Sequence, residues 1–150
     1  MKDGSQAPPH GRDLRVGPPD PAASPPEARR AQGNAAEERA CRHLEAAGFA
    51  IVERNFRTKA GEIDIVARKG DLIAFVEVRS REDAGFGTPE ESVTPAKRRR
   101  IVAAARRYLS NVPPPSWREA RFDVIAIEGT GERAELRHYP GAFDAKGKIL

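Results

Sequence analysis

Two short apolar segments of this sequence carry acidic residues at positions where a buried strand would have hydrophobic ones. Residues 61–67 read GEIDIVA and residues 72–79 read LIAFVEVR, and both are rich in the residues typical of strands. Glu62, Asp64 and Glu77 lie inside these segments. A buried carboxylate is unfavourable unless it is paired or bound to a cation, so the pattern indicates a site built on strands.

The residues between the two segments, Arg68–Asp71, predict a tight hairpin turn. Centring the hairpin there places Asp64 opposite Phe75 and Glu62 opposite Glu77. Opposed residues share a face, as do residues two apart along a strand. One face is then predicted to carry four polar side chains, Glu62, Asp64, Glu77 and Arg79. The other is predicted to be apolar, with Ile63, Ile65, Ala74, Val76 and Val78. Converging carboxylates repel each other, and a hard divalent cation would relieve this, so we expect a metal site.

The composition limits the class of protein. At 150 residues the chain is long enough for one domain with a hydrophobic core. The single cysteine, Cys41, excludes an intrachain disulfide framework, and the histidines His10, His43 and His138 are scattered without zinc-ligand spacing. No apolar run approaches membrane-spanning length, and the N-terminus lacks the apolar core of a secretory signal. We therefore expect a cytoplasmic protein without membrane contact.

The first 30 residues are dominated by proline, glycine, alanine and charged residues. Beyond Met1, their only aliphatic side chains larger than alanine are Leu14 and Val16. Such a segment cannot bury enough apolar area to offset the entropy lost on ordering, so we predict a disordered tail over residues 1–30. The folded domain is then expected over residues 31–150.

A first helix is predicted from Ala35 to Ala47, because this stretch has few β-branched residues and Gly48 follows it. At 100° per residue Glu37 falls on the inward side, which makes it a candidate site residue. The alternative is that Glu37 lies at the edge of the stripe and reaches solvent. The predicted apolar stripe is Ala36, Ala40, Cys41, Leu44 and Ala47.

A second helix is predicted from an N-cap at Thr94, with Pro95 at the first helical position, to Leu109. Four consecutive cations crowd its first turns: Lys97, Arg98, Arg99 and Arg100. Cations there oppose the helix dipole and repel one another, which favours a bound anion. The alternative is a solvated charged face, and the net charge of +4 permits a polyanionic partner without requiring one.

The remaining segments predict strands and loops around these two helices. Further strands are expected over Phe49–Phe56, Arg121–Glu128 and Ala134–Tyr139, and a loop over Arg81–Glu91. Helix, three strands, helix and two strands in this order predict an α/β domain with a mixed central sheet flanked by helices.

These features resemble the PD-(D/E)XK nuclease superfamily and, within it, the YraN-like family of bacterial proteins. The superfamily signature is an acid, a second acid and a lysine on a hairpin of a restriction-endonuclease-like αβββαβ core. Asp64 matches the first acid and Glu77 the second, whereas Arg79 stands where lysine is usual. Glu37 matches an acid that some members contribute from the first helix. The YraN-like match is wider and takes in residues 33–37, 54–57, 61–64, 75–79, Lys97 and 121–124.

The resemblance implies that Asp64 and Glu77 hold Mg2+ or Mn2+, helped by the backbone carbonyl of Val78 and by Glu37 through water. Arg79 stays protonated and so cannot act as a general base, but it can bind a phosphate oxygen. Glu62 is then either an outer-shell acid or an ion-pair partner of a nearby cation, Arg57, Lys59 or Arg79. The expected nucleic-acid contacts are Arg57, Lys59, Arg81, Lys97, Arg98, Arg99 and Arg100.

Three hypotheses about function follow. The first is a metal-dependent endonuclease that hydrolyses DNA, selecting branched or damaged structures rather than a sequence. The second is a nucleic-acid-binding module of the same fold without turnover, which Arg79 favours. The third treats the acids and arginines as a structural ion-pair cluster. DNA is favoured over RNA, a homodimer would suit a duplex with two strands, and a protein partner is left open.

Overall fold

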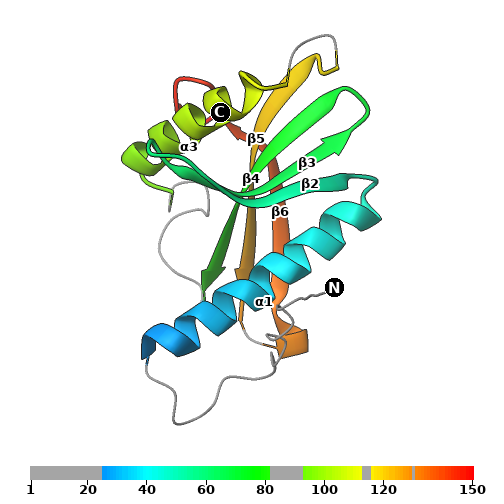
Figure 1. The fold of residues 1–150 in the computed structure, drawn as a ribbon. Coiled ribbons are helices and arrows are strands. Elements are labelled where there is room, and N and C mark those ends of the chain that lie inside the picture. Colours follow the sequence, from blue (N-terminus) through cyan, green and yellow to red (C-terminus); the bar gives the residue numbers. More distant parts are fainter. Residues whose placement is uncertain (1–24, 82–92, 113–115, 130) are drawn as a thin grey trace, which may run out of the picture. The chain divides into compact units, whose positions relative to one another are not determined.

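The computed structural model describes residues 25–81, 93–112, 116–129 and 131–150, apart from the side chains of residues 25–33 and of Arg81. Residues 36–150 form one compact unit. Its strands and helices are traced in Figure 1. The described elements are α1 (Pro25–Ala46), β2 (Ala50–Arg57), β3 (Glu62–Lys69), β4 (Leu72–Arg81), α3 (Pro95–Leu109), β5 (Glu119–Glu128), the 3-10 helix η2 (Gly131–Arg133) and β6 (Glu135–Phe143).

The described strands form one five-stranded sheet in the order β2-β3-β4-β5-β6. Strands β4 and β5 run parallel, while the other neighbouring pairs are antiparallel. A parallel pair needs a long crossover connection, and α3 lies in the segment that supplies it. The fold is therefore a mixed α/β domain with an αβββαβ core, which confirms the predicted fold class. Residues 82–91 of the predicted loop lie outside the described residues.

The register of the β3–β4 hairpin differs from the predicted one by two residues. Val66 pairs with Phe75, and the last pair before the turn is Lys69 with Leu72. The turn is therefore only two residues long and begins at Gly70, whose φ of +62° suits the first position of a tight hairpin turn. A shift of two keeps the side chains of the paired residues, from Ile65 and Val76 to the turn, on their predicted faces, whereas a shift of one would have exchanged the faces.

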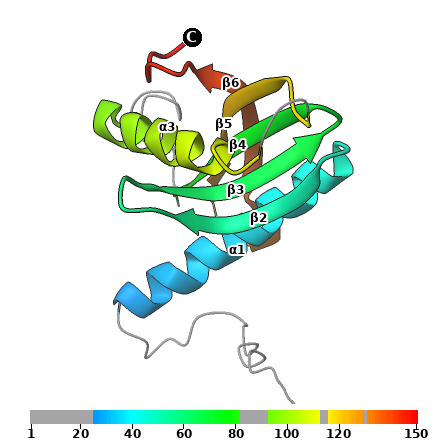
Figure 2. The same cartoon turned by 45° about the horizontal axis from the view of Figure 1, so that its top comes forward.

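The two faces of the sheet pack against different helices, as Figure 2 shows with α3 on one side and α1 on the other. One core forms against α3 and the other against residues 36–44 of α1. Ile63 belongs to the α3 core, so its predicted place beside Ile65 is wrong. Ile63 lies outside the paired part of the hairpin, which ends at Ile65 and Val76. The α1 core contains Ala36, Ala40, Cys41, Leu44, Ile65, Ala74, Val76 and Ile125, with Val78 packed against it.

The two helices begin and end for identifiable reasons. α1 begins at Pro25, earlier than the predicted Ala35, because residues 27–32 are helix formers and proline is accepted in a first turn. It ends at Ala46, so Ala47 is exposed and its predicted place on the buried stripe is wrong. In α3 the predicted cap is confirmed, since Oγ1 of Thr94 accepts a 3.1 Å hydrogen bond from the Lys97 amide. Within the described residues, no helix is both long and apolar enough to cross a membrane.

Candidate functional site

Asp64 lies where the pairing of β3 with β4 ends. The last pair on this side is Ile65 with Val76, so continuing the register places Asp64 opposite Glu77. Oδ2 of Asp64 accepts a 2.8 Å hydrogen bond from the backbone amide of Val78. The carboxyl groups of Asp64 and Glu77 also lie close enough to affect each other's protonation. The structure therefore brings the two acids together from adjacent strands, as the strand pattern predicts.

Burial controls the protonation of this pair. The pKa of Glu77 is raised to about 8, mainly by burial and next by the nearby charge of Asp64. The positive charge of Lys97 opposes this rise. Burial also raises the pKa of Asp64, although the Val78 amide opposes this shift. Without a bound cation the pair therefore holds a proton near neutral pH. A divalent ion would remove both the repulsion and the need for that proton.

Two cationic side chains approach Glu77, which is 3% exposed. Nζ of Lys97 lies 3.5 Å from Oε2 of Glu77, and Nη1 of Arg79 lies 3.8 Å from the same oxygen. The Nε atom of Arg79 is buried and has no hydrogen-bond partner among the described residues. Lys97 therefore joins α3 to the acidic pair, and Arg79 presents an unused donor beside it.

Glu37 approaches the pair from α1. Its side chain is 16% exposed, so it faces the sheet rather than solvent, which decides between the two interpretations of its position. Oε1 of Glu37 accepts a 3.4 Å hydrogen bond from Nδ2 of Asn55 and lies 3.6 Å from Nη2 of Arg54. Burial raises the pKa of Glu37, and the nearby charge of Asp64 adds to the rise. Glu37 is therefore close enough to Asp64 to belong to the same site.

Asn55 is a site residue that the sequence reasoning missed. Among the described residues other than glycine, it alone has a positive φ, which is +55°. Asparagine tolerates this left-handed conformation better than most residues. The register of β2 with β3 places Asn55 opposite Asp64, and its amide holds Glu37. An asparagine inside a strand-like segment was the available signal.

Glu62 forms an ion pair with Arg57, one of the three cations that the sequence analysis named as possible partners. Nε of Arg57 lies 3.2 Å from Oε1 of Glu62, and both side chains are partly exposed. The charge of Glu62 also raises the pKa of Asp64, so Glu62 remains near the acidic pair. An ion pair with Arg57 is therefore observed, and a role for Glu62 in an outer shell stays a prediction.

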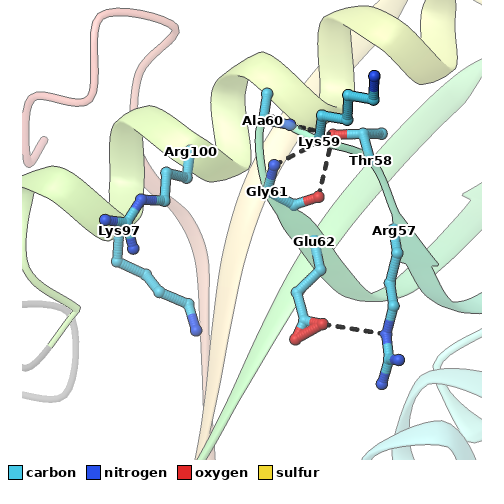
Figure 3. Close-up of a pocket in the computed structure, with 8 residues that line it drawn as sticks. All are labelled: Arg57, Thr58, Lys59, Ala60, Gly61, Glu62, Lys97 and Arg100. Atoms are coloured by element: carbon cyan, nitrogen blue, oxygen red, sulfur yellow. Dashed lines mark hydrogen bonds and ion pairs between the residues drawn. The ribbon is translucent and has the colours of Figure 1, made fainter.

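A basic cavity of about 370 Å³ opens between the β2–β3 turn and α3. Figure 3 shows the polar ends of Arg57, Glu62 and Lys97 extending to the same side of the turn, whereas the Lys59 amine points the opposite way. Because Lys97 also contacts Glu77, the cavity adjoins the acidic pair. The lining residues are Arg57, Thr58, Lys59, Ala60, Gly61, Glu62, Lys97 and Arg100.

The wall of this cavity depends on a close approach between Gly61 and α3. A Cβ atom at Gly61 would lie 2.6 Å from the backbone oxygen of Arg100, a distance that real side chains do not adopt. The turn itself is closed by Thr58, whose Oγ1 accepts hydrogen bonds from the Ala60 and Gly61 amides at 3.0 and 3.1 Å. These amides are used within the turn, so an anion in the cavity would bind to side chains.

The predicted nucleic-acid contacts separate into different groups. Arg98 is only 8% exposed, and its guanidinium donates to the backbone oxygens of Val93 and Gly147. Arg98 is therefore a structural residue, and its prediction as a phosphate contact is wrong. Arg99 and Arg100 are exposed, and only Arg100 of the two lines the cavity. The side chain of Arg81 lies outside the described residues, and the carbonyl of Val78 stays a predicted ligand.

The donor set is compatible with a hard cation held by few protein ligands. In the described part of the chain, no group of three or more His, Cys, Asp or Glu side chains is arranged to hold a metal ion. Mg2+ is commonly held by one or two carboxylates, with water and substrate phosphate oxygens completing six positions. Asp64 and Glu77 would supply those two carboxylates, and burial raises the pKa of both, a shift that a bound cation would oppose.

Comparisons with known proteins identify the family. The model of the family described as "Uncharacterised protein family UPF0102" matches residues 36–127. A UPF0102 protein of Myxococcus xanthus is 52% identical over 120 residues, which cover 80% of this chain and 94% of that protein. One from Syntrophotalea carbinolica is 44% identical over 115 residues, covering 77% and 93%. The chain therefore belongs to the UPF0102 family, the YraN-like family that its sequence resembles.

Proposed function

We propose that this protein is a divalent-metal-dependent endonuclease that hydrolyses phosphodiester bonds in DNA. The observation that carries the proposal is the meeting of a buried carboxylate, Glu77, and a half-buried one, Asp64, beside a cavity lined with cations. Paired acids with raised pKa values in a concave, basic surface are typical of a catalytic site for anionic substrates. The αβββαβ core supports the same conclusion by analogy with nucleases of this fold.

The chain itself would position the reacting groups. Asp64 is fixed by the Val78 amide, and Glu77 is oriented by Lys97 and Arg79. A bound Mg2+ or Mn2+ supplies polarisation of the phosphodiester and acidification of the attacking water. Arg79 remains a cation, and its partly exposed guanidinium would donate to a phosphate oxygen and stabilise the charge of the transition state.

The basic cavity would hold the nucleic acid beside these acids. Glu62 partly neutralises Arg57, and Glu77 partly neutralises Lys97, so Arg100 is the main cation of the cavity toward a phosphate. Contacts of this kind do not read bases. They weaken as the salt concentration rises, because the release of counterions from the DNA then gains less free energy. Selection by shape, such as a branch, fork or flap, is therefore the specificity that we propose.

A cleavage panel tests the proposal and finds the substrate. Linear duplex, single strand, flap, fork and four-way junction DNA, with an RNA control, are incubated with Mg2+ or Mn2+. We expect one branched DNA to be cut fastest, with Asp64→Asn and Glu77→Gln at least about 100-fold slower, since metal-assisted charge stabilisation contributes several kcal/mol. Asp71→Asn, in the exposed turn of the same hairpin, is the matched control and should cut normally.

The second candidate is a DNA-binding module of the same fold without turnover. The observation that favours it is Arg79, which cannot take up a proton from the attacking water. Salt-sensitive binding without cleavage of any substrate in the panel would select this function. If Asp64→Asn instead lowers the melting temperature strongly and Mg2+ leaves it unchanged, the acids form only a structural ion-pair cluster.

A further inference from the structure

Two histidines that are far apart in the sequence meet outside the candidate site. Nε2 of His43, on α1, lies 3.2 Å from Nδ1 of His138, on β6. The two rings are nearly perpendicular, at 81°, and their centroids are 5.2 Å apart. The contact is partly buried and joins the C-terminal half of α1 to the edge strand of the sheet.

A buried carboxylate fixes the orientation of His138. Asp123 is 0% exposed, and its Oδ2 lies 2.8 Å from Nε2 of His138. The carboxylate also accepts hydrogen bonds from Arg121, at 2.8 and 3.0 Å, and from the Gly141 amide, at 3.1 Å. Because a carboxylate accepts rather than donates, the His138 proton lies on Nε2. The lone pair of Nδ1 is therefore directed at His43.

We propose that His43 and His138 form a binding site for a divalent transition-metal ion of the Zn2+ type, held between α1 and β6. Two imidazole nitrogens bound to one tetrahedral zinc at about 2.0–2.1 Å lie about 3.3–3.4 Å apart. The observed separation is 3.2 Å, so the two nitrogens already lie near the required spacing, and both rings would rotate to aim their lone pairs at the ion. A histidine ligand whose other nitrogen donates to a carboxylate is the usual arrangement around protein-bound zinc.

The proposed ion differs in kind from the one expected at Asp64 and Glu77. Imidazole pairs favour Zn2+, Ni2+ and Cu2+, whereas paired carboxylates favour Mg2+ and Mn2+. On binding, the His43 proton moves from Nε2 to Nδ1, so the ring stays neutral and no proton is released. Water would complete the coordination, since the described residues offer no third histidine, cysteine or acid at this position.

Zinc titration in the presence of excess Mg2+ tests the site without reference to nuclease activity. We expect one equivalent of Zn2+ to bind and to shift the nitrogen NMR signals of His43 Nε2 and His138 Nδ1, while His138 Nε2 keeps its proton. His43→Asn and His138→Gln should each weaken binding by at least about tenfold. In His138→Gln the amide can still donate to Asp123, and His10→Gln is the control for the third histidine of the chain.

The outcomes that overturn the proposal are distinct. Ring signals of His43 and His138 that do not change with Zn2+ would exclude coordination, whatever the variants do. Zinc affinity that is equal in wild type, His43→Asn and His138→Gln would place the ion elsewhere. Either result would leave the pair as a hydrogen bond between α1 and the sheet.

Discussion

Asp64 accepts a 2.8 Å hydrogen bond from the backbone amide of Val78, the residue that follows Glu77. This contact exists because the pairing of β3 with β4 stops at Ile65 and Val76, which leaves the next amide free for a side chain. One acid is thus held by the strand that carries the other. The candidate site therefore owes its geometry to the point where the two strands separate, and its rigidity to backbone rather than to long side chains.

The stability of the metal-free protein should fall as the pH rises. The pKa of Glu77 is raised from its ordinary value of 4.5 to about 8, chiefly by burial. Between these pH values the folded state binds more protons than the unfolded state, so the free energy of unfolding decreases with pH. We expect the melting temperature in chelator to decline from pH 5 to about pH 8.

Glu77→Gln is the control for this pH dependence, because glutamine has the same size and does not ionise. The variant should gain stability over the wild type as the pH rises, and the difference should vanish toward pH 5. Mg2+ added at pH 8 should raise the melting temperature of the wild type only. A constant difference between the two proteins at every pH would show that Glu77 ionises at its ordinary pKa.

Gly61→Ala should damage both stability and DNA binding. The new Cβ would meet the backbone of Arg100 at 2.6 Å, which forces the β2–β3 turn away from α3. Overpacking of this kind costs about 1–3 kcal/mol of unfolding free energy. Chemical denaturation measures the loss, with Ala60→Ser in the exposed neighbouring position as control. An unchanged midpoint would mean that the turn and the helix are not pressed together.

The three consecutive arginines of α3 should give three different results. Arg100→Gln should weaken DNA binding and reduce the slope of log affinity against log salt by about one, with little change in stability. Arg98→Gln should destabilise the fold by about 1.5–3 kcal/mol, because its guanidinium donates to two backbone oxygens. Arg99→Gln is the exposed control for both measurements. If all three variants weaken DNA binding equally, the arginines contribute only to the general positive charge of α3.

Asn55 variants should separate the strain of the backbone from the function of the amide. Asn55→Gly removes the side chain that holds Glu37 but suits the positive φ, so stability should be kept while cleavage slows. Asn55→Ala should also lose about 1 kcal/mol of stability, because alanine disfavours this conformation. Cleavage by Asn55→Gly at the wild-type rate would show that Glu37 needs no such support.

Periodicity predicted the faces of the hairpin better than its register. Asp64 and Glu77 stay on one face whether the hairpin closes on Lys69 and Gly70 or on Gly70 and Asp71, since the two registers differ by an even number. The two-residue turn that decided the register depends on the conformation of Gly70, which the sequence leaves open. The hydrophobic pattern was therefore sufficient to predict that the acids share a face of the hairpin. It was insufficient to predict which residues lie opposite each other.

Three other features of the structure could be predicted from the sequence only in part or not at all. Arg98 lies on the same helical stripe as Ile101 and Val102, so the phase of α3 could have separated it from Arg100. The contact of His43 with His138 joins positions 95 residues apart and depends on which strand lies at the sheet edge, which no local pattern reveals. Asn55 was open to suspicion as an asparagine inside a strand-like segment, but its contact with Glu37 depends on a positive φ that the sequence does not show.

The most direct measurement is the single-turnover rate of cleavage of a branched DNA as the Mg2+ concentration is raised from zero. The wild-type rate should rise from nothing to a plateau, and Asp71→Asn should follow the same curve. Asp64→Asn should remain at least about 100-fold below that plateau at every concentration. A rate that does not depend on Mg2+, or that Asp64→Asn matches, would contradict the assignment of Asp64 and Glu77 as the metal-holding acids.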